Sequence, residues 1–343
     1  MADSKSPARY KVLITDYIWP SLEVEERALE EVEAVAVVAP DGGEETLAAL
    51  AEDVDGILTC FAPVTDRVLR AASRCMVVSR YGVGVDNIDV DAATELGMVV
   101  AYVPDYCVDE VSDHTLALLL ALNRKLVHFD RYAREESWGK VPLTLPVARL
   151  RGRVLGIIGL GRIGHEVCRK ARAFGMEVLA HDPYISDKVF AAIGARPVSL
   201  DTLLRESDFV TLHTPLTAET IGLIGEPQLR LMKPTALLIN CARGPVVDEQ
   251  ALVTALREGW IAGAGLDVLQ SPLPTPDNPL LQMENVLVTP HVAFFSRESL
   301  HELRSRAVGG VVNVLRGEVP DNVANPSVLS HSRAKLGSSR RRS

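Results

Sequence analysis

The sequence predicts an α/β protein with two doubly wound parallel sheets. Short apolar runs alternate with segments of helical periodicity along most of the 343 residues, which is the pattern of successive strand and helix units in parallel sheets. One apolar run ends in a glycine-rich turn, residues 159–164, and this turn opens a helix. A chain of this length can form two domains that each enclose a core of their own.

Five short apolar runs in the first third of the chain are interpreted as strands. Segments with helical periodicity separate them, among them residues 21–32 and 89–96. Five strands are close to the number found in a flavodoxin-like sheet. The predicted strands are residues 11–15, 35–38, 56–59, 76–79 and 98–102.

One long helix is predicted for residues 109–124, because its apolar positions recur three and four residues apart. We expect this helix to connect the two domains. Residues 138–151 contain two prolines and little periodicity, and they are interpreted as a linking loop.

The alternation of strands and helices restarts at residue 154 and gives a second sheet, whose six strands suit a dinucleotide-binding fold. The six strands are residues 154–158, 177–181, 209–213, 236–239, 262–266 and 286–288. A last helix, residues 296–316, is long enough to return to the first domain.

The predicted organisation is a Rossmann cofactor domain inserted in a flavodoxin-like substrate domain. The substrate domain comprises residues 1–108 and 296–329, and the cofactor domain comprises residues 109–295. The remaining residues, 330–343, are polar and basic, with Arg340, Arg341 and Arg342 in succession. We expect them to form a mobile tail.

The composition, 47% hydrophobic and 24% charged, is typical of globular proteins and excludes a long disordered chain. The formal net charge is −9, although residues 333–343 carry five positive charges and no acidic residue. Because the rest of the chain is therefore strongly acidic, nucleic acid is not expected as a partner, and three tail arginines would neutralise few phosphates.

Five cysteines are an odd number, and their wide spacing in apolar or helical surroundings favours free thiols and a reducing compartment. No stretch reaches 18 apolar residues, and residues 1–10 have no apolar core typical of a signal peptide. We therefore expect a cytoplasmic protein without a membrane span. The cysteines are Cys60, Cys75, Cys107, Cys168 and Cys241.

Residues 154–164 read as a strand that ends in the pattern G-x-G-x-x-G and leads into a helix near Arg162. Gly159 permits a tight turn, Gly161 lets the backbone approach a pyrophosphate, and Gly164 lets strand and helix pack closely. A turn that only tightens a strand and helix unit is the alternative interpretation. The pattern predicts a dinucleotide site.

Asp182 ends the next predicted strand, 18 positions after Gly164. A carboxylate there can accept hydrogen bonds from the adenosine ribose and would repel a 2′-phosphate. Because Pro183 and Tyr184 follow, with no arginine, we predict NAD rather than NADP as the cofactor.

The predicted strand ends of the second sheet carry polar side chains, and strand ends line the ligand crevice in doubly wound folds. Arg243 and His291 both follow such strands. With a hydride carrier bound, oxidation of an alcohol needs a proton acceptor, which His291 can supply, and a fixed cation, which Arg243 can supply. A helix-capping or buried histidine is the alternative for His291.

The chain resembles the D-isomer-specific 2-hydroxyacid dehydrogenase family over about residues 11–325, and within it most resembles the C-terminal-binding-protein branch. The residues that carry the resemblance are 80–89, 150–164, 180–184, 213–219, 240–249 and 289–296. The resemblance implies an NAD-dependent enzyme that interconverts a 2-keto acid and a D-2-hydroxy acid in a cleft between two domains. It also implies a homodimer built on the cofactor domain, with residues 109–138 contributing.

The resemblance assigns Arg243 to the substrate carboxylate and carbonyl, and His291 to acid/base catalysis. Backbone amides of Val83 and Gly84 would hold the carboxylate. Phe294 or Phe295 would close the substrate pocket, with packing at a helix start as the alternative. Arg80 and Tyr81 are candidates for recognising the substrate side group, with a surface ion pair as the alternative for Arg80. The predicted cofactor-binding residues are Gly159, Gly161, Arg162, Ile163, Gly164, Asp182, His213, Pro215, Thr220, Cys241, Ala242 and Asp267.

The family usually has a glutamate five positions after the residue matching Asp267, where it orients the catalytic histidine, but here Pro272 stands at that position. Another group, Gln270, Asp277 or Glu284, would then orient His291, or the histidine works unassisted. Loss of such a carboxylate lowers the rate without abolishing the chemistry. An NAD(H)-sensing, corepressor-like protein with weak catalysis is the alternative function.

The other histidines do not cluster in the sequence. His114, His128, His165, His301 and His331 lie on predicted helices or in the tail, without the ligand spacing of a zinc site. We therefore predict no metal site.

Overall fold

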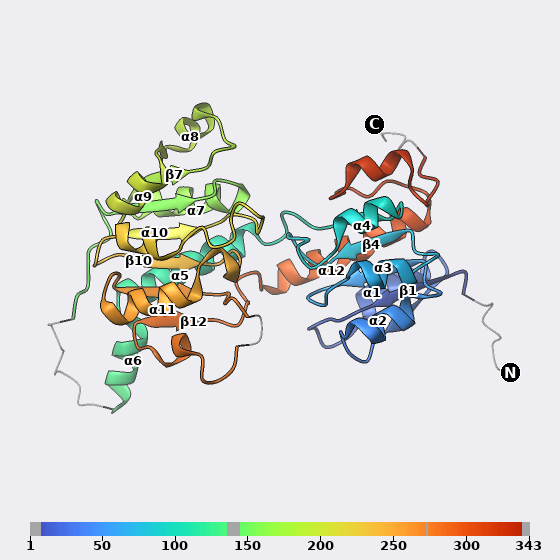
Figure 1. Ribbon diagram of the computed structural model, residues 1–343, viewed down its shortest axis with the longest axis horizontal. Coiled ribbons are helices and arrows are strands. Elements are labelled where there is room, and N and C mark those ends of the chain that lie inside the picture. The colour runs from blue at the N-terminus through green and yellow to red at the C-terminus, as the bar shows by residue number, and fades with distance from the viewer. Residues whose placement is uncertain (1–7, 136–144, 272–273, 338–343) are drawn as a thin grey trace. The chain divides into compact units, whose positions relative to one another are not determined.

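The computed structural model describes residues 8–135, 145–271 and 274–337 (Figure 1). The chain divides into two compact units. Unit 1 comprises Met1–Tyr106 and Ser296–Ser343, and unit 2 comprises Cys107–Phe295. Within the described ranges, none of the helices has both the length and the apolar composition that crossing a lipid bilayer requires.

Unit 1 contains a five-stranded sheet in which every pair of neighbours is parallel. The strand order, β2-β1-β3-β4-β5, is that of flavodoxin-like folds. The predicted strands agree with the observed ones to within about two residues at each end. The observed strands are β1 (Tyr10–Ile14), β2 (Ala34–Val38), β3 (Gly56–Thr59), β4 (Val77–Arg80) and β5 (Val99–Ala101).

The long helix α12 (Arg297–Leu315) packs on strands β3, β4 and β5 of unit 1 and beside α1 (Glu23–Glu30). Gly310 permits this approach, because a Cβ there would lie 3.1 Å from the Cβ of Ala101. Three further helices contribute a buried core around Leu13, Ile57 and Val78. They are α2 (Glu44–Ala51), α3 (Asp66–Ala71) and α4 (Val90–Glu95).

Unit 2 contains a seven-stranded parallel sheet with the order β12-β11-β10-β9-β6-β7-β8. The order reverses between β6 and β9, which is the switch point at which doubly wound folds bind dinucleotides. Six strands were predicted, and the seventh, β8, is only two residues long and contains Pro197. The strands are β6 (Val154–Ile158), β7 (Glu177–His181), β8 (Arg196–Pro197), β9 (Phe209–Leu212), β10 (Leu237–Asn240), β11 (Gly263–Leu266) and β12 (Val286–Val288).

Two separate cores lie on the sheet of unit 2. One joins the leucines of α5 (Val108–Asn123) to α7 (Arg162–Ala173), and Leu119 and Val167 are fully buried in it. The other core contains Leu203, Leu229 and Leu252 from three further helices. The remaining helices of unit 2 are α6 (Leu126–Glu135), α8 (Asp187–Ile193), α9 (Leu200–Glu206), α10 (Glu226–Leu231) and α11 (Glu249–Glu258), with the short 3-10 turns η1 (Gly244–Val246) and η2 (Pro279–Gln282).

Part of the predicted tail is held against unit 1. After the 3-10 turn η3 (Pro326–Ser330), the Arg333 guanidinium donates to the carbonyls of Ala72, Ser73 and Cys75, near the end of α3. The Arg333 amide donates to the Gly97 carbonyl. Arg340, Arg341 and Arg342 lie outside the described residues.

Candidate functional site

At two positions of the glycine turn after β6, only glycine fits. Gly159 has φ +89°, and a Cβ there would lie 2.7 Å from the carbonyl carbon of His213. A Cβ at Gly164 would lie 2.3 Å from the Gly159 carbonyl oxygen. At Gly161, by contrast, a Cβ would meet no atom within 4 Å. The space beside Gly161, which directly precedes α7, is therefore open, as close approach of an anion requires.

The first turn of α7 contains the predicted residues Arg162, Ile163 and Gly164. Gly161 precedes it as the N-cap, so no side chain caps the helix. The first amides of a helix have no partners within the helix and bind anions well. The turn therefore fits the pyrophosphate of a dinucleotide.

Asp182 follows β7 directly, and its carboxylate bridges two loops. One oxygen accepts from the Leu160 amide at 2.8 Å, and the other accepts from the Tyr184 amide at 2.9 Å. The carboxylate is thereby fixed beside the glycine turn. Each oxygen keeps a lone pair that can accept from a ribose hydroxyl.

The end of β9 lies against the glycine turn and carries His213. Burial lowers the pKa of His213 to about 3, so the ring is neutral at pH 7. Its Nε2 lies 3.0 Å from Thr211 Oγ1, whereas its Nδ1 and the hydroxyl of Thr214 are buried without a hydrogen-bond partner among the described residues. Two buried, unsatisfied polar atoms at the switch point fit a polar cofactor that would satisfy them.

The loop after His213 closes on itself through Thr220. Its hydroxyl donates to the Pro215 carbonyl at 2.7 Å and accepts from the Thr217 amide at 2.8 Å. Pro215 and Thr220, both predicted to bind the cofactor, are thus joined by a hydrogen bond in one turn after β9.

Asn240 shapes the turn that presents Arg243. Its side chain is buried, accepts from the Ala242 amide at 3.0 Å and donates to the Arg243 carbonyl at 2.9 Å. The guanidinium of Arg243 also donates to the Ala242 carbonyl. Burial raises the pKa of the Cys241 thiol to about 12, so the thiol is neutral.

Asp267, after β11, holds the turn that contains His291. Its carboxylate accepts from the amides of Val292 and Ala293, each at 2.9 Å, and its backbone carbonyl accepts from the His291 amide at 2.9 Å. His291 itself has φ +53°, a left-handed conformation that is strained for a residue other than glycine. Strain of this kind persists only where surrounding contacts impose it.

The two predicted aromatic residues near His291 differ in burial. The Phe294 ring is buried and lies edge-on to the His291 ring, with 6.3 Å between the ring centroids. Phe295 is 57% exposed. Phe294 is therefore the one whose ring lies beside the imidazole.

The sheet register brings the turn that presents Arg243 and the turn that contains His291 to the same end of the sheet. Asn240 is paired with Leu266, and Leu266 is paired with Val288. Strands β10 and β12 therefore end at the same level on either side of β11, about 10 Å apart. Arg243 and His291 therefore extend from loops at the same end of the sheet.

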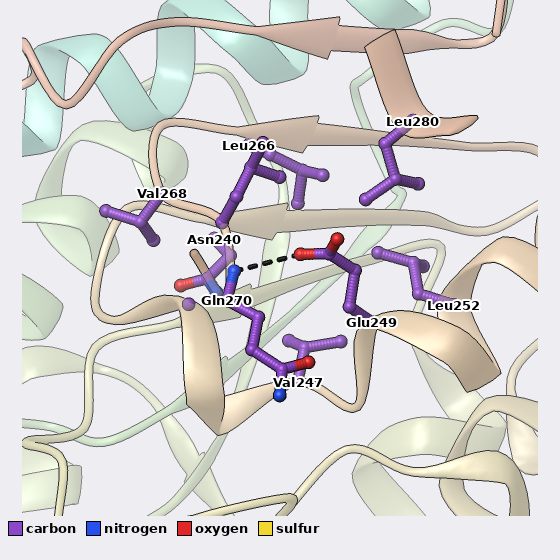
Figure 2. Close-up of a pocket in the computed structure, with 10 residues that line it drawn as sticks. Asn240, Val247, Glu249, Leu252, Leu266, Val268, Gln270 and Leu280 are labelled. Carbon is purple, nitrogen blue, oxygen red and sulfur yellow. Dashed lines mark hydrogen bonds between the residues drawn. The ribbon is translucent and has the colours of Figure 1, made fainter. Parts of the chain in front are cut away.

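A pocket behind the arginine turn is organised by Glu249. Figure 2 shows its carboxylate directed toward Gln270 among Leu252, Leu266 and Leu280. One oxygen accepts from the Gln270 amide at 2.9 Å, and the other accepts from the Asn278 side chain at 2.8 Å. One carboxylate thus anchors both sides of the segment that contains Pro272, which itself lies outside the described residues.

Two of the three residues considered as partners of His291 have other contacts. Glu284 is ion-paired with Arg131 at 3.2 Å. A hydrogen bond with Thr275 lowers the pKa of Asp277. The Gln270 side chain is exposed.

In unit 1, the predicted residues Arg80 and Tyr81 are both buried. The Tyr81 hydroxyl donates to Glu25 at 3.3 Å, and burial raises the pKa of this hydroxyl well above its usual value. Val83 is 36% exposed, and Gly84 is half-buried. The surface around the glycine turn of unit 1 is therefore formed by Val83 rather than by Tyr81.

The sequence interpretation placed His114 on a helix without a clustered partner, but on α5 it has one. Its Nε2 lies 2.9 Å from Thr289 Oγ1, and that hydroxyl donates to Asp267 Oδ1 at 2.5 Å. His114 and Thr289 are 175 positions apart in the sequence, so no spacing pattern relates them. Within the described ranges, no group of three or more side chains of the metal-binding types comes together.

The glycine turn at a switch point and the polar strand ends define the class of protein, a dinucleotide-binding α/β oxidoreductase. Residues 116–293 match the model of the D-isomer specific 2-hydroxyacid dehydrogenase NAD binding domain. The chain belongs to the D-isomer specific 2-hydroxyacid dehydrogenase family, and its cofactor is NAD.

Two relatives and one solved structure support this family assignment. A glyoxylate reductase from Korarchaeum cryptofilum is 44% identical over 282 residues, which cover 81% of this chain and 85% of the relative. A D-3-phosphoglycerate dehydrogenase from Archaeoglobus fulgidus is 42% identical over 266 residues, 77% of this chain and 50% of that protein. The structure of D-lactate dehydrogenase from Aquifex aeolicus, complexed with NAD and lactic acid, matches with a TM-score of 0.82 and 28% identity, covering 96% and 100% of the two chains.

Proposed function

We propose that the protein interconverts a 2-keto acid and the corresponding D-2-hydroxy acid. The observation that supports this proposal is the arrangement at the carboxyl end of the sheet in unit 2, where Arg243 follows β10 and His291 follows β12. A buried polar side chain holds each of the two turns. Bound NAD supplies or accepts the hydride at C2 of the substrate. The chain supplies orientation and the proton.

Arg243 binds the substrate carboxylate and polarises the carbonyl. Its planar fork of donors suits two neighbouring oxygens, and its charge stabilises the oxyanion that develops at C2. The hydrogen bonds of Asn240 fix the backbone from which this side chain extends.

His291 exchanges the proton of the reacting oxygen. In reduction the imidazolium donates a proton from a ring nitrogen to the carbonyl oxygen, and in oxidation the neutral ring accepts the hydroxyl proton. The left-handed backbone and the contact with Phe294 restrict the directions in which the ring can point.

Other residues of the candidate site are proposed to bind either the cofactor or the substrate. The first amides of α7, the Asp182 carboxylate and the unsatisfied atoms of His213 and Thr214 are proposed to hold NAD. In unit 1, the amides of Val83 and Gly84 are proposed to bind a carboxylate. The burial of Tyr81 favours a supporting role behind that turn.

The test is turnover of a panel of 2-keto acids, including glyoxylate, with NADH and NADPH. His291→Asn removes the acid/base group but tolerates the left-handed backbone, so we expect a folded protein whose kcat/KM is lower by about 10²- to 10⁴-fold. Replacement of the exposed His301 on α12 by asparagine is the control and should leave kcat/KM unchanged. Equal rates for the wild type and His291→Asn would reject the assigned role of His291.

The same measurements separate this function from an NAD(H)-sensing, corepressor-like role, which Pro272 favours in the sequence. A sensor would bind NADH tightly and reduce none of the keto acids at a useful rate. It would also change its assembly state when NADH binds.

We further propose a homodimer to which α6 contributes, and a reducing compartment such as the cytoplasm. No residue of α6 is buried, although the helix carries apolar side chains. All five cysteines are free thiols, and four of them are buried.

A further inference from the structure

We propose that His114 and Thr289 are positioning residues for His291. The proposal rests on the proposed function, because it concerns the group that exchanges the proton. A chain of hydrogen bonds leads from the His114 ring through the Thr289 hydroxyl to the Asp267 carboxylate, and from there to the amides of Val292 and Ala293.

The direction of every hydrogen bond in this chain follows from donor chemistry. Backbone amides only donate, so both oxygens of Asp267 act as acceptors toward Val292 and Ala293. The Thr289 hydroxyl must then donate its one hydrogen to Asp267. Its oxygen accepts from His114, which places a hydrogen on Nε2 of that ring whether the ring is neutral or charged.

The chain of hydrogen bonds ends at the strained turn that contains His291. The amides of the two residues after His291 are bound by the Asp267 carboxylate, and the His291 amide is bound by the Asp267 carbonyl. If the carboxylate rotates, these amides lose their acceptor and the left-handed backbone can relax. Thr289 and His114 prevent that rotation, since they occupy and orient Oδ1, which His114 Nε2 approaches to 3.6 Å.

Burial makes these contacts effective. Asp267 is 1% exposed, so its charge depends on the donors that surround it. His114 comes from α5, which packs on β10, β11 and β12. A packed helix therefore supplies the outermost donor of the hydrogen-bond chain. In this protein, Pro272 stands where the family usually has the glutamate that orients the histidine.

Two pairs of variants separate hydrogen bonding from packing. Thr289→Val keeps the shape and removes the hydroxyl, whereas Thr289→Ser keeps the hydroxyl. His114→Leu removes the donor, whereas His114→Gln can place an amide hydrogen near the position of Nε2. We expect kcat to fall by about tenfold or more in Thr289→Val and His114→Leu. The dissociation constant for NADH should stay within about twofold of the wild-type value, and Thr289→Ser and His114→Gln should retain most of kcat.

Hydrogen exchange gives a readout that does not depend on turnover. The amides of Val292 and Ala293 should exchange about five- to tenfold faster in Thr289→Val and His114→Leu than in the wild type or the two conservative variants. The double variant His114→Leu/Thr289→Val should behave as either single variant, because both act through one chain.

Unchanged exchange at Val292 and Ala293 in Thr289→Val would overturn the proposal, and so would equal losses in the conservative and non-conservative variants. If exchange responds as expected but His291→Asn retains full turnover, the positioning holds and the proposed role of His291 fails instead.

Discussion

Buried polar side chains at the strand ends of unit 2 determine what the neighbouring backbone can do. Asn240 and Asp267 are each 1% exposed and each satisfies backbone groups of the turn beside it. An unsatisfied buried polar group costs about 1–3 kcal/mol, so these side chains favour one conformation of each turn strongly over the alternatives. Hydrogen bonds within the protein itself thereby stabilise the conformation of each turn.

His213 makes the stability of the protein depend on pH. Burial lowers its folded-state pKa from 6.5 to about 3, so between these values the unfolded chain binds a proton that the folded chain does not. Stability is therefore lost as the pH falls from about 6.5 toward 3, by up to about 1.4 kcal/mol per pH unit from this residue. His213→Gln keeps a polar side chain without this titration.

Urea unfolding of the wild type and His213→Gln at pH 7, 6 and 5 measures the effect. We expect the difference in the free energy of unfolding between the two proteins to shift in favour of His213→Gln as the pH falls. A difference that is constant over this range would show that the imidazole titrates alike in both states.

At the residue scale, the sequence could place residues that belong to contiguous motifs, but it could not relate residues that only the fold brings together. Gly159, Gly164 and Asp182 could be placed because turns and strand ends have local patterns. His114 could not, because its partner Thr289 is brought to it only by the packing of α5 on the sheet. Tyr81 was a candidate for recognising the substrate side group, yet its ring is buried beside Trp19 and its hydroxyl donates to Glu25.

Helix α6 is an element whose apolar side chains have no place in the core of unit 2. Leu126 is 54% exposed and Val127 is 58% exposed. It begins directly after Lys125, whose φ of +55° turns the chain out of α5. The sequence predicted α5 from its long apolar periodicity but did not separate α6, because the break between them depends on one left-handed residue.

The exposed apolar side chains of α6 allow a test of the proposed homodimer, in which charged residues replace them. If a second copy covers Leu126 and Val127, Leu126→Lys/Val127→Lys should place two charges in the interface and convert the dimer to monomer. Analytical ultracentrifugation measures this directly. Glu135→Lys, at the end of the same helix, is the control and should remain dimeric. A wild type that sediments as a monomer at high concentration would exclude the dimer.

At the scale of the whole molecule, the alternation of strands and helices was enough to predict two parallel sheets, because buried parallel strands are apolar throughout. The strand β8 was missed because two residues, both exposed, carry no apolar pattern. The proposed place of the cofactor site follows from topology, since the strand order reverses beside the glycine turn. Cofactor binding should therefore raise the free energy of unfolding, and this gain should depend on the place where the backbone comes closest to the pyrophosphate.

We propose Gly161 as that place, and its surroundings allow a direct test. A Cβ there meets no atom within 4 Å and the backbone φ is −74°, so Gly161→Val should fold normally while its side chain fills the space left for the pyrophosphate. At a hundredfold excess of NADH over its dissociation constant the wild type should gain about 2.7 kcal/mol of stability, and Gly161→Val should gain almost none. Gly309→Ala, in α12 of unit 1, also meets no atom within 4 Å. As the control, it should raise the stability of the apoprotein by about 1 kcal/mol and keep the full gain from NADH. Chemical denaturation with and without NADH measures both quantities, and an undiminished gain in Gly161→Val would move the cofactor away from the glycine turn.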